Sequence, residues 1–264
     1  MTIIQTIIIS IVEGITEFIP ISSTGHMIIT EKLLNVTEDD FVKVFTVAIQ
    51  LGAILAVVVL YWKKFFDFSR WQFYLKLLVG VIPALILGFL FSKQIDTLLE
   101  SSLTVAISML VGGVVLLFID RLFKDPTIQT EMQVSYKRSF VIGLWQCIAM
   151  IPGASRSAAS IIGGLQQKLT RGAAAEFSFF LAVPTMLAAT GYKLLKYIKQ
   201  DGWFTLDQIE LLAFGNIVAF IVALLAIRFF INFLKNNGLR IWGVYRVAVG
   251  IILLILILTG YINK

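Results

Sequence analysis

The sequence predicts an all-α protein that crosses a membrane several times, and three observations lead to this fold class. Of the 264 residues, 58% are hydrophobic and 14% are charged, whereas about 25% of the residues of a soluble domain are charged. The mean hydropathy is +0.91. Several apolar runs also reach the roughly 20 residues that a helix needs to cross the hydrocarbon core of a bilayer. We therefore expect a single integral membrane domain over residues 1–264.

The apolar runs that are long enough to span fall into two groups of three. They are residues 41–62, 73–91 and 103–119 in the first group, and 173–192, 211–233 and 244–262 in the second. The most polar segment, residues 122–138, separates the groups, and we interpret it as a loop between halves of about 1–121 and 139–264.

A short apolar segment precedes each group of spans. Residues 3–19 and 140–151 are too short to cross a bilayer, and each leads into Ile-Pro and then a serine, with Pro20 and Ser23 matching Pro152 and Ser155. Broken segments at matching positions in two halves are typical of inverted-repeat membrane folds. We predict that each half is a re-entrant helix hairpin plus three transmembrane helices. Irregular backbone at membrane depth requires surrounding protein or water, so both hairpin turns should line one site near the midplane.

The basic residues of the loops predict the orientation of the chain. One side of the membrane would hold Lys63, Lys64, Arg70, Arg121, Lys124, Lys137, Arg138, Lys235 and Arg240, and the other Lys32, Lys43, Lys93, Lys196, Lys199 and Lys264. The larger set is expected in the cytoplasm, which places both termini outside. The net charge of +6 comes from these scattered loop residues, which favours lipid headgroups over nucleic acid as partners. A homodimer is possible, and the sequence does not decide the oligomeric state.

The first hairpin turn, residues 13–26, carries ionisable groups inside an apolar segment. Glu13 and Glu17 are four residues apart, so in a helix they share one face and need a proton or a cation between them. Carboxylate oxygens suit Mg²⁺ or Ca²⁺. Ser22 is a candidate helix cap and phosphate ligand. Ser23 and His26 lie within one turn, and a serine–histidine pair is the minimal arrangement for an activated nucleophile.

The second hairpin turn, around Gly153, Ser155 and Arg156, is predicted to form an anion-binding site that we call the anion cradle. Gly153 lets the backbone approach a ligand, and a helix that begins near Ser155 directs free N–H groups into the site. The Arg156 guanidinium matches phosphate oxygens, and Ser157 and Ser160 add hydroxyl groups. An arginine and two helix starts attract an anion that two glutamates repel, and a phosphate bridged by a divalent metal satisfies both. We interpret Glu176, Arg228 and Arg246 as interfacial, since they lie near span ends.

The motifs Glu-Gly-Ile-Thr-Glu-Phe-Ile-Pro-Ile-Ser-Ser-Thr-Gly-His and Pro-Gly-Ala-Ser-Arg-Ser closely resemble those of the bacterial undecaprenyl-diphosphate phosphatase, or bacitracin-resistance, family. The resemblance covers the whole chain. It implies a plasma-membrane hydrolase that converts undecaprenyl diphosphate to undecaprenyl phosphate and inorganic phosphate, which recycles the lipid carrier for cell-wall synthesis. It also implies a Mg²⁺ or Ca²⁺ requirement and an active site that opens to the outer face. The family motifs fall on the residues Glu13, Glu17, Ser23, His26, Ser155 and Arg156, with Ser160 where threonine is common.

Two questions stay open at this point. Either Ser23 or His26 serves as the nucleophile, with Glu17 and Glu13 holding metal and Arg156 carrying phosphoryl charge. A lipid phosphatase with a histidine nucleophile and a second histidine as acid is excluded, because the chain has one histidine. The remaining alternative is a transporter or flippase of a polyprenyl phosphate lipid, since broken helices at the midplane are also transporter architecture.

Overall fold

The computed structural model describes residues 1–37, 39–99 and 101–262, and the regular elements in these ranges are helices, apart from a single bridge between Ile128 and Leu169. The helices are α1 (Ile3–Thr16), α2 (Ser23–Leu33), α3 (Asp40–Ala48), α4 (Gln50–Leu60), α5 (Trp62–Phe65), η1 (Phe68–Arg70), α6 (Trp71–Leu90), α7 (Ser92–Leu99), α8 (Ser102–Leu122), η2 (Glu131–Gln133), α9 (Tyr136–Gln146), η3 (Cys147–Met150), α10 (Arg156–Gln166), α11 (Arg171–Asp201), α12 (Leu206–Asn237) and α13 (Arg240–Leu258).

Six helical segments among the described residues are long and apolar enough to cross a membrane, as the sequence predicts. They are Asp40–Leu60, Phe68–Leu90, Ser102–Leu122, Arg171–Asp201, Leu206–Asn237 and Arg240–Leu258. The expectation of an all-α, multi-pass membrane protein is confirmed. The short helix α7 was not predicted. The helix α11 continues well beyond the C-terminal end of its apolar run, and α12 extends beyond both ends of its run.

The ends of the longest helices follow from their capping residues. Thr170 caps α11 by accepting a hydrogen bond from the N–H of Ala173, and Thr205 and Gln208 form a capping box at the start of α12. Both helices end at a glycine, Gly202 with φ 88° and Gly238 with φ 70°. Glycine adopts this left-handed backbone without the steric cost that a Cβ atom brings.

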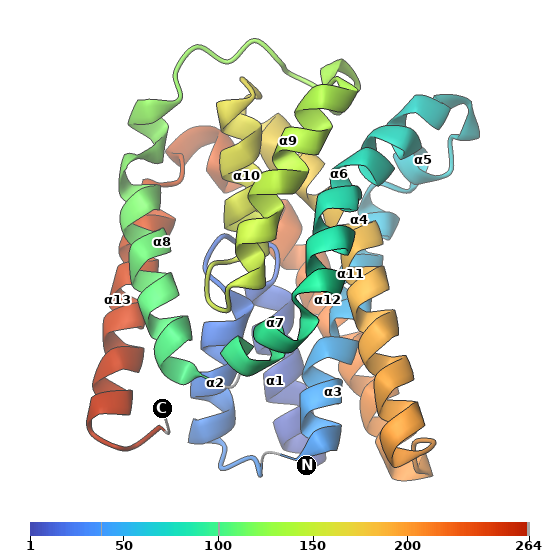
Figure 1. Ribbon diagram of the computed structural model, residues 1–264, viewed down its shortest axis with the longest axis vertical. Coiled ribbons are helices and arrows are strands. Elements are labelled where there is room, and N and C mark those ends of the chain that lie inside the picture. Colours follow the sequence, from blue (N-terminus) through green and yellow to red (C-terminus); the bar gives the residue numbers. More distant parts are fainter. Residues whose placement is uncertain (38, 100, 263–264) are drawn as a thin grey trace.

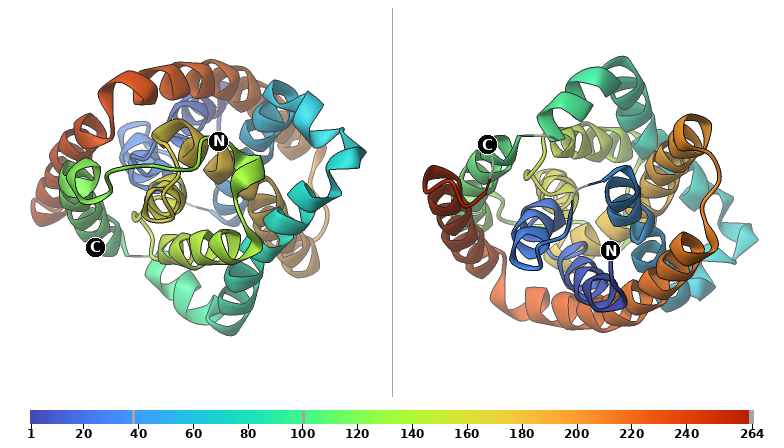
Figure 2. Two further views of the ribbon diagram at one scale, coloured as in Figure 1. Left: turned by 90° about the horizontal axis from the view of Figure 1, so that it is seen from above. Right: turned by 90° about the horizontal axis from the view of Figure 1, so that it is seen from below.

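The two short segments form helix pairs that enter the bundle from opposite ends. Figure 1 shows α1 and α2 in the lower part of the molecule, α9 and α10 in the upper part, and the two turns near mid-height. In the views along the long axis, α2 and α10 lie inside a ring to which α6, α8, α11, α12 and α13 contribute (Figure 2). This arrangement brings residues 17–22 close to residues 151–155. The inverted repeat itself stays a prediction.

Buried phenylalanine rings hold the first turn against α11. The ring of Phe18 is fully buried and meets Phe179 edge-on, with the ring centroids 5.2 Å apart. Phe180 packs in the same way on Phe73 at 5.3 Å and on Tyr61 at 4.9 Å. Edge-to-face pairs add about 0.5–1.5 kcal/mol each to the burial of the rings. The turn after α1 is therefore anchored to a rigid helix rather than to a mobile loop.

Candidate active site

The first turn buries both glutamates. Glu13 lies in the last turn of α1 and is 1% exposed, and Glu17 follows the helix and is 8% exposed. The chain then turns through residues 18–21, and α2 begins at Ser23 after Ser22, which has φ 71°. A positive φ costs energy for a residue other than glycine, and such strain gathers at functional sites.

The second turn repeats this backbone conformation. Ser155 has φ 72°, and its Oγ caps α10 by accepting a hydrogen bond from the N–H of Ala158. The matching positions are therefore Ser22 and Ser155, and the sequence pairing of Ser23 with Ser155 is wrong by one residue. Gly153 has φ 88°, and a Cβ atom there would lie 2.5 Å from the carbonyl oxygen of Val105. Glycine is thus required for the close approach of this turn to α8.

A carboxylate links the two turns. The Nη2 of Arg156 lies 3.0 Å from Oε1 of Glu17, although the two residues are 139 positions apart in the sequence. The other oxygen of Glu17, Oε2, accepts a hydrogen bond of 2.7 Å from Oγ of Ser23. The expectation that residues of the two motifs meet inside the protein is correct for these three side chains.

Arg156 is held on several sides and keeps free donor capacity. Its guanidinium carbon lies 5.4 Å from the centroid of the Phe18 ring, and Nη1 donates to the carbonyl oxygen of Ser178 at 3.2 Å. Nη2 also approaches the sulfur of Met186 at 3.4 Å. The Nε atom is buried and has no hydrogen-bond partner. A buried donor without a partner is costly, so this N–H is a ready donor for an oxyanion.

His26 does not pair with Ser23. Its Nδ1 lies 2.8 Å from the carbonyl oxygen of Ser22, and its Nε2 lies 2.8 Å from the hydroxyl of Tyr245, whose ring is parallel to the imidazole. A carbonyl oxygen only accepts, so Nδ1 carries a proton, and in the neutral ring Nε2 accepts from Tyr245. The spacing argument for a direct serine–histidine contact fails because Ser23 turns towards Glu17 instead.

The hydroxyl groups of Ser155, Ser157 and Ser160, which are predicted to bind phosphate, form hydrogen bonds within the protein. Ser157 donates to the carbonyl oxygen of Ile19 at 3.0 Å, which ties the second turn to the first. Ser155 and Ser157 are joined at 3.1 Å, and Ser160 donates to the carbonyl oxygen of Arg156 at 2.8 Å. These contacts position the arginine and the helix start. The hydroxyl of Ser22, by contrast, makes no capping hydrogen bond.

Among the described residues of the two turns, Glu13 and Glu17 are the carboxylates that could hold a divalent cation. No group of three or more histidine, cysteine, aspartate or glutamate side chains gathers anywhere in the described part of the chain. Oε1 of Glu13 is buried without a hydrogen-bond partner, whereas both oxygens of Glu17 already accept one hydrogen bond each. Mg²⁺ commonly takes one or two carboxylates and completes its shell with water and substrate phosphates. The residues present fit such an ion, with Glu13 as the ligand that has room.

Comparisons with known proteins identify the family of the chain. The family described as "Bacitracin resistance protein BacA" matches residues 6–252. The chain belongs to this family. It is 58% identical to a protein of Flavobacterium psychrophilum named undecaprenyl-diphosphatase, over 97% of this chain and 96% of that protein. A protein of the same name from Porphyromonas gingivalis is 50% identical over 98% of both chains. Another from Aquifex aeolicus is 44% identical over 96% of this chain and 97% of that protein.

In this member of the BacA family, Arg246 is a site residue that sequence reasoning missed. Its position near the end of a span predicts an interfacial residue, but its side chain is 0% exposed. Its guanidinium donates to main-chain carbonyl oxygens of both turns and of α8. These are Pro20 at 3.4 Å, Gly153 and Ala154 at 2.9 Å, Ser108 at 3.2 Å and Met109 at 3.4 Å. Arg246 therefore connects the two turns through hydrogen bonds to their main-chain carbonyl oxygens.

A local signal for this contact exists in the sequence. Gly112 and Gly113 form a pair within α8, and a Cβ atom at Gly112 would collide with the guanidinium of Arg246. Two adjacent glycines inside an apolar span indicate close approach of another chain segment. The sequence gives no means of choosing the partner, since Arg246 lies more than a hundred residues away. Tyr245, the partner of His26, was missed for the same reason.

Proposed function

We propose that the protein is a membrane phosphatase that hydrolyses undecaprenyl diphosphate to undecaprenyl phosphate and inorganic phosphate. This reaction returns the lipid carrier to cell-wall synthesis and would confer resistance to bacitracin. The observation that carries the proposal is the link Ser23–Glu17–Arg156, which joins a hydroxyl nucleophile, a carboxylate base and an anion-binding guanidinium at the meeting point of two helix starts. The names of the relatives describe the same reaction.

Ser23 is the nucleophile in this proposal. Its Oγ attacks the terminal phosphorus and gives its proton to Oε2 of Glu17, 2.7 Å away. The undecaprenyl phosphate then leaves, and water later releases the phosphate from the serine. Covalent catalysis usually relies on a nucleophile that is hydrogen-bonded to a base, while a third group orients the base. His26 is the weaker candidate, because Nε2 already accepts from Tyr245 and Nδ1 is committed to Ser22.

Arg156 and the two helix starts bind the terminal phosphate. The Nε of Arg156 has no partner, and the N-termini of α2 and α10 direct main-chain N–H groups and a positive dipole end towards the turns. Phosphoryl transfer depends mainly on positioning and charge stabilisation. Ser22, Gly153, Ser155, Ser157 and Ser160 shape this cradle, and Ser22 has the hydroxyl that is free to meet the phosphate.

Glu13 and Glu17 would hold the Mg²⁺ or Ca²⁺ ion. When bound, the ion supplies positive charge that offsets the diphosphate oxygens and the carboxylates. Support comes from the unpartnered, buried Oε1 of Glu13.

We propose that the active site opens to the outer face of the plasma membrane. α5 carries Lys63 and Lys64, η1 carries Arg70, and the start of α9 carries Lys137. α5 and the start of α9 lie at the upper end of the molecule, and α1 and α2 approach the site from the opposite end (Figure 1). The positive-inside rule assigns the basic end to the cytoplasm.

A phosphate-release assay on the purified protein tests the function. We expect release of phosphate from a polyprenyl diphosphate, loss of release with a chelator, and a loss of at least 100-fold for Arg156→Ala. Arg121→Ala, an exposed arginine at the end of α8, should keep wild-type turnover. Lipid binding without turnover, together with translocation of a lipid phosphate in vesicles, would instead identify a transporter.

A further inference from the structure

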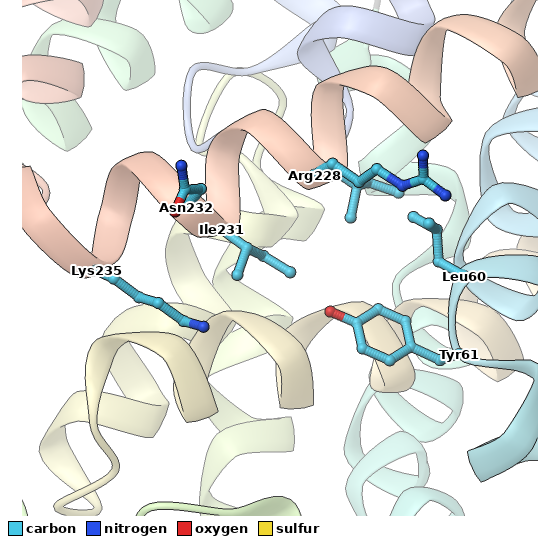
Figure 3. A pocket seen from close by; sticks show the side chains of 7 residues that line it. Leu60, Tyr61, Arg228, Ile231, Asn232 and Lys235 are labelled. Carbon is cyan, nitrogen blue, oxygen red and sulfur yellow. The ribbon is translucent and has the colours of Figure 1, made fainter.

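A second charged cleft lies away from the active site, between the end of α4 and the last turns of α12. Its volume is about 300 Å³. It is lined by Leu60, Tyr61, Arg228, Ile231, Asn232 and Lys235 (Figure 3). The Tyr61 hydroxyl and the Lys235 side chain point into the gap beside Ile231, and Arg228 lies at the other end, above Leu60 (Figure 3).

The polar side chains of this cleft share one face of α12. Arg228, Asn232 and Lys235 are spaced by four and three residues, which places them in line along a helix. Neither cation forms an ion pair with any residue in the described ranges. The carboxylates near this end of α12 are already paired, Glu176 with Lys64 at 3.1 Å and Asp120 with Arg171 at 2.8 Å. No carboxylate in the described ranges is therefore bound directly to Arg228 or Lys235, and both cations are available to an anion.

The depth of the cleft matches the headgroup region of a bilayer. Leu60 ends the first candidate span, and Trp62, two residues later, is 56% exposed, as is typical of an interfacial aromatic residue. The neighbouring Leu225 and Phe229 on α12 are 64% and 57% exposed, so an apolar surface continues from the cleft towards the hydrocarbon.

We propose that this cleft binds the phosphate group of an anionic phospholipid, with the acyl chains lying over Leu225 and Phe229. Arg228 and Lys235 supply the positive charge, and the Asn232 amide and the Tyr61 hydroxyl donate hydrogen bonds. Hydrogen bonds between a cationic side chain and a phosphate are stronger than those between neutral groups. Basic pockets between membrane helices on the cytoplasmic side are suited to anionic headgroups. A soluble phosphate ion would use the polar groups but not the apolar surface.

The test compares two matched double variants in detergent. Arg228→Gln with Lys235→Gln removes the charges of the cleft, and Arg121→Gln with Lys137→Gln removes one arginine and one lysine from exposed positions at the same end. Native mass spectrometry counts bound phosphatidylglycerol or phosphatidylcholine, and thermal unfolding gives the Tm with each lipid or with inorganic phosphate alone. Gel filtration checks that each variant is folded, and the single variants replace the double variant if it aggregates.

We expect the wild type and the exposed-charge variant to retain phosphatidylglycerol and to gain Tm from it. The cleft variant should lose about tenfold in phosphatidylglycerol affinity, and Lys235→Arg, which keeps the charge, should retain it. Equal losses in the two double variants, or no loss in the cleft variant, would overturn the proposal. A wild-type Tm gain from inorganic phosphate as large as that from phosphatidylglycerol would also overturn it, because the site would then take a free anion.

Discussion

Glu17 is the residue on which both turns converge, because each of its carboxylate oxygens serves a different motif. Oε1 accepts from Arg156 on α10, and Oε2 accepts from Ser23 on α2. The ion pair orients the carboxylate, and the carboxylate in turn orients the serine hydroxyl. A change in any one of the three side chains therefore disturbs the other two.

Coupling within this group gives a kinetic expectation. Ser23→Ala and Glu17→Gln should each lower kcat/KM by about 10³-fold or more, because nucleophile and base act as one unit. The double variant should be little worse than either single variant. Phosphate release under single-turnover conditions measures all four proteins. Losses that multiply in the double variant would show that Glu17 and Ser23 act independently, and His26 would become the nucleophile to test.

Glu13 should act on metal affinity rather than on the serine. Glu13→Gln is expected to raise the Mg²⁺ or Ca²⁺ concentration needed for half-maximal activity by at least tenfold, since one carboxylate ligand is lost. The gain in Tm on titration with the same ion, measured without substrate, should shrink in parallel. Glu210→Gln, an exposed glutamate on α12, serves as the control. An unchanged metal titration for Glu13→Gln would remove this residue from the metal site.

Among the helices, α8 and α13 form the frame that fixes the distance between the two turns. Arg246 extends from α13 across the glycine pair of α8 and donates to carbonyl oxygens of both turns. These carbonyls are exposed by the turns and have no helical partner of their own. A guanidinium has five donors in a rigid plane, so one side chain satisfies acceptors from three segments at once.

The glycine pair offers a test that leaves every polar group in place. Gly112→Ala should displace the Arg246 guanidinium and destabilise the protein by about 2–3 kcal/mol, because buried carbonyl oxygens lose their donor. Gly191→Ala is the matched control in α11, where a Cβ atom has nothing within 4 Å. That change should be neutral or stabilise by up to about 1 kcal/mol. Urea titration of both variants in detergent measures the difference, and equal stabilities would contradict this role of Arg246.

The elements differ in how far the sequence predicts them. Span length and hydropathy predicted the six long helices, and Pro20, Pro152 and Gly153 predicted where the short segments turn. The partners inside the site were harder. Helical spacing suggested that Ser23 meets His26, but the turn rotates Ser23 towards Glu17. Contacts of Arg246 and Tyr245 join residues that are between 92 and 226 positions apart in the sequence, and no local pattern specifies such pairs.

At the scale of the whole molecule, ion pairs gather at the end that carries the basic loops. Glu131 in the loop between α8 and α9 is buried and accepts from Arg70 at 2.8 Å, with Lys64 at 3.2 Å. Burial alone raises the pKa of Glu131, but the hydrogen bond from Arg70 and the charge of Lys64 outweigh it and hold the pKa below its ordinary value of 4.5. The cluster ties the central loop to α5, η1 and α11.

This lowered pKa makes the stability of that end depend on pH. Because the folded-state pKa of Glu131 lies below the unfolded one, its contribution is fully present above about pH 4.5 and is lost as the pH falls through the folded-state pKa. Glu131→Gln should lower the Tm at pH 7 and should reduce the loss of Tm between pH 5 and pH 3. Thermal unfolding of both proteins over this range measures the effect. Parallel Tm curves would show that other carboxylates cause the acid sensitivity.

The orientation of the molecule decides which face of the membrane supplies the substrate, and a labelling experiment can establish it. Cys147 is the only cysteine, so Cys147→Ser gives a background without thiols. Gln129→Cys then marks the loop between α8 and α9, and Gln200→Cys marks the far end of α11; both positions are exposed. The end with more lysine and arginine should face the cytoplasm. An impermeant maleimide should therefore label position 200 in intact cells and position 129 only after lysis. The opposite pattern would place α1 and α2 on the cytoplasmic side, and the diphosphate would then have to reach Ser23 from inside the cell.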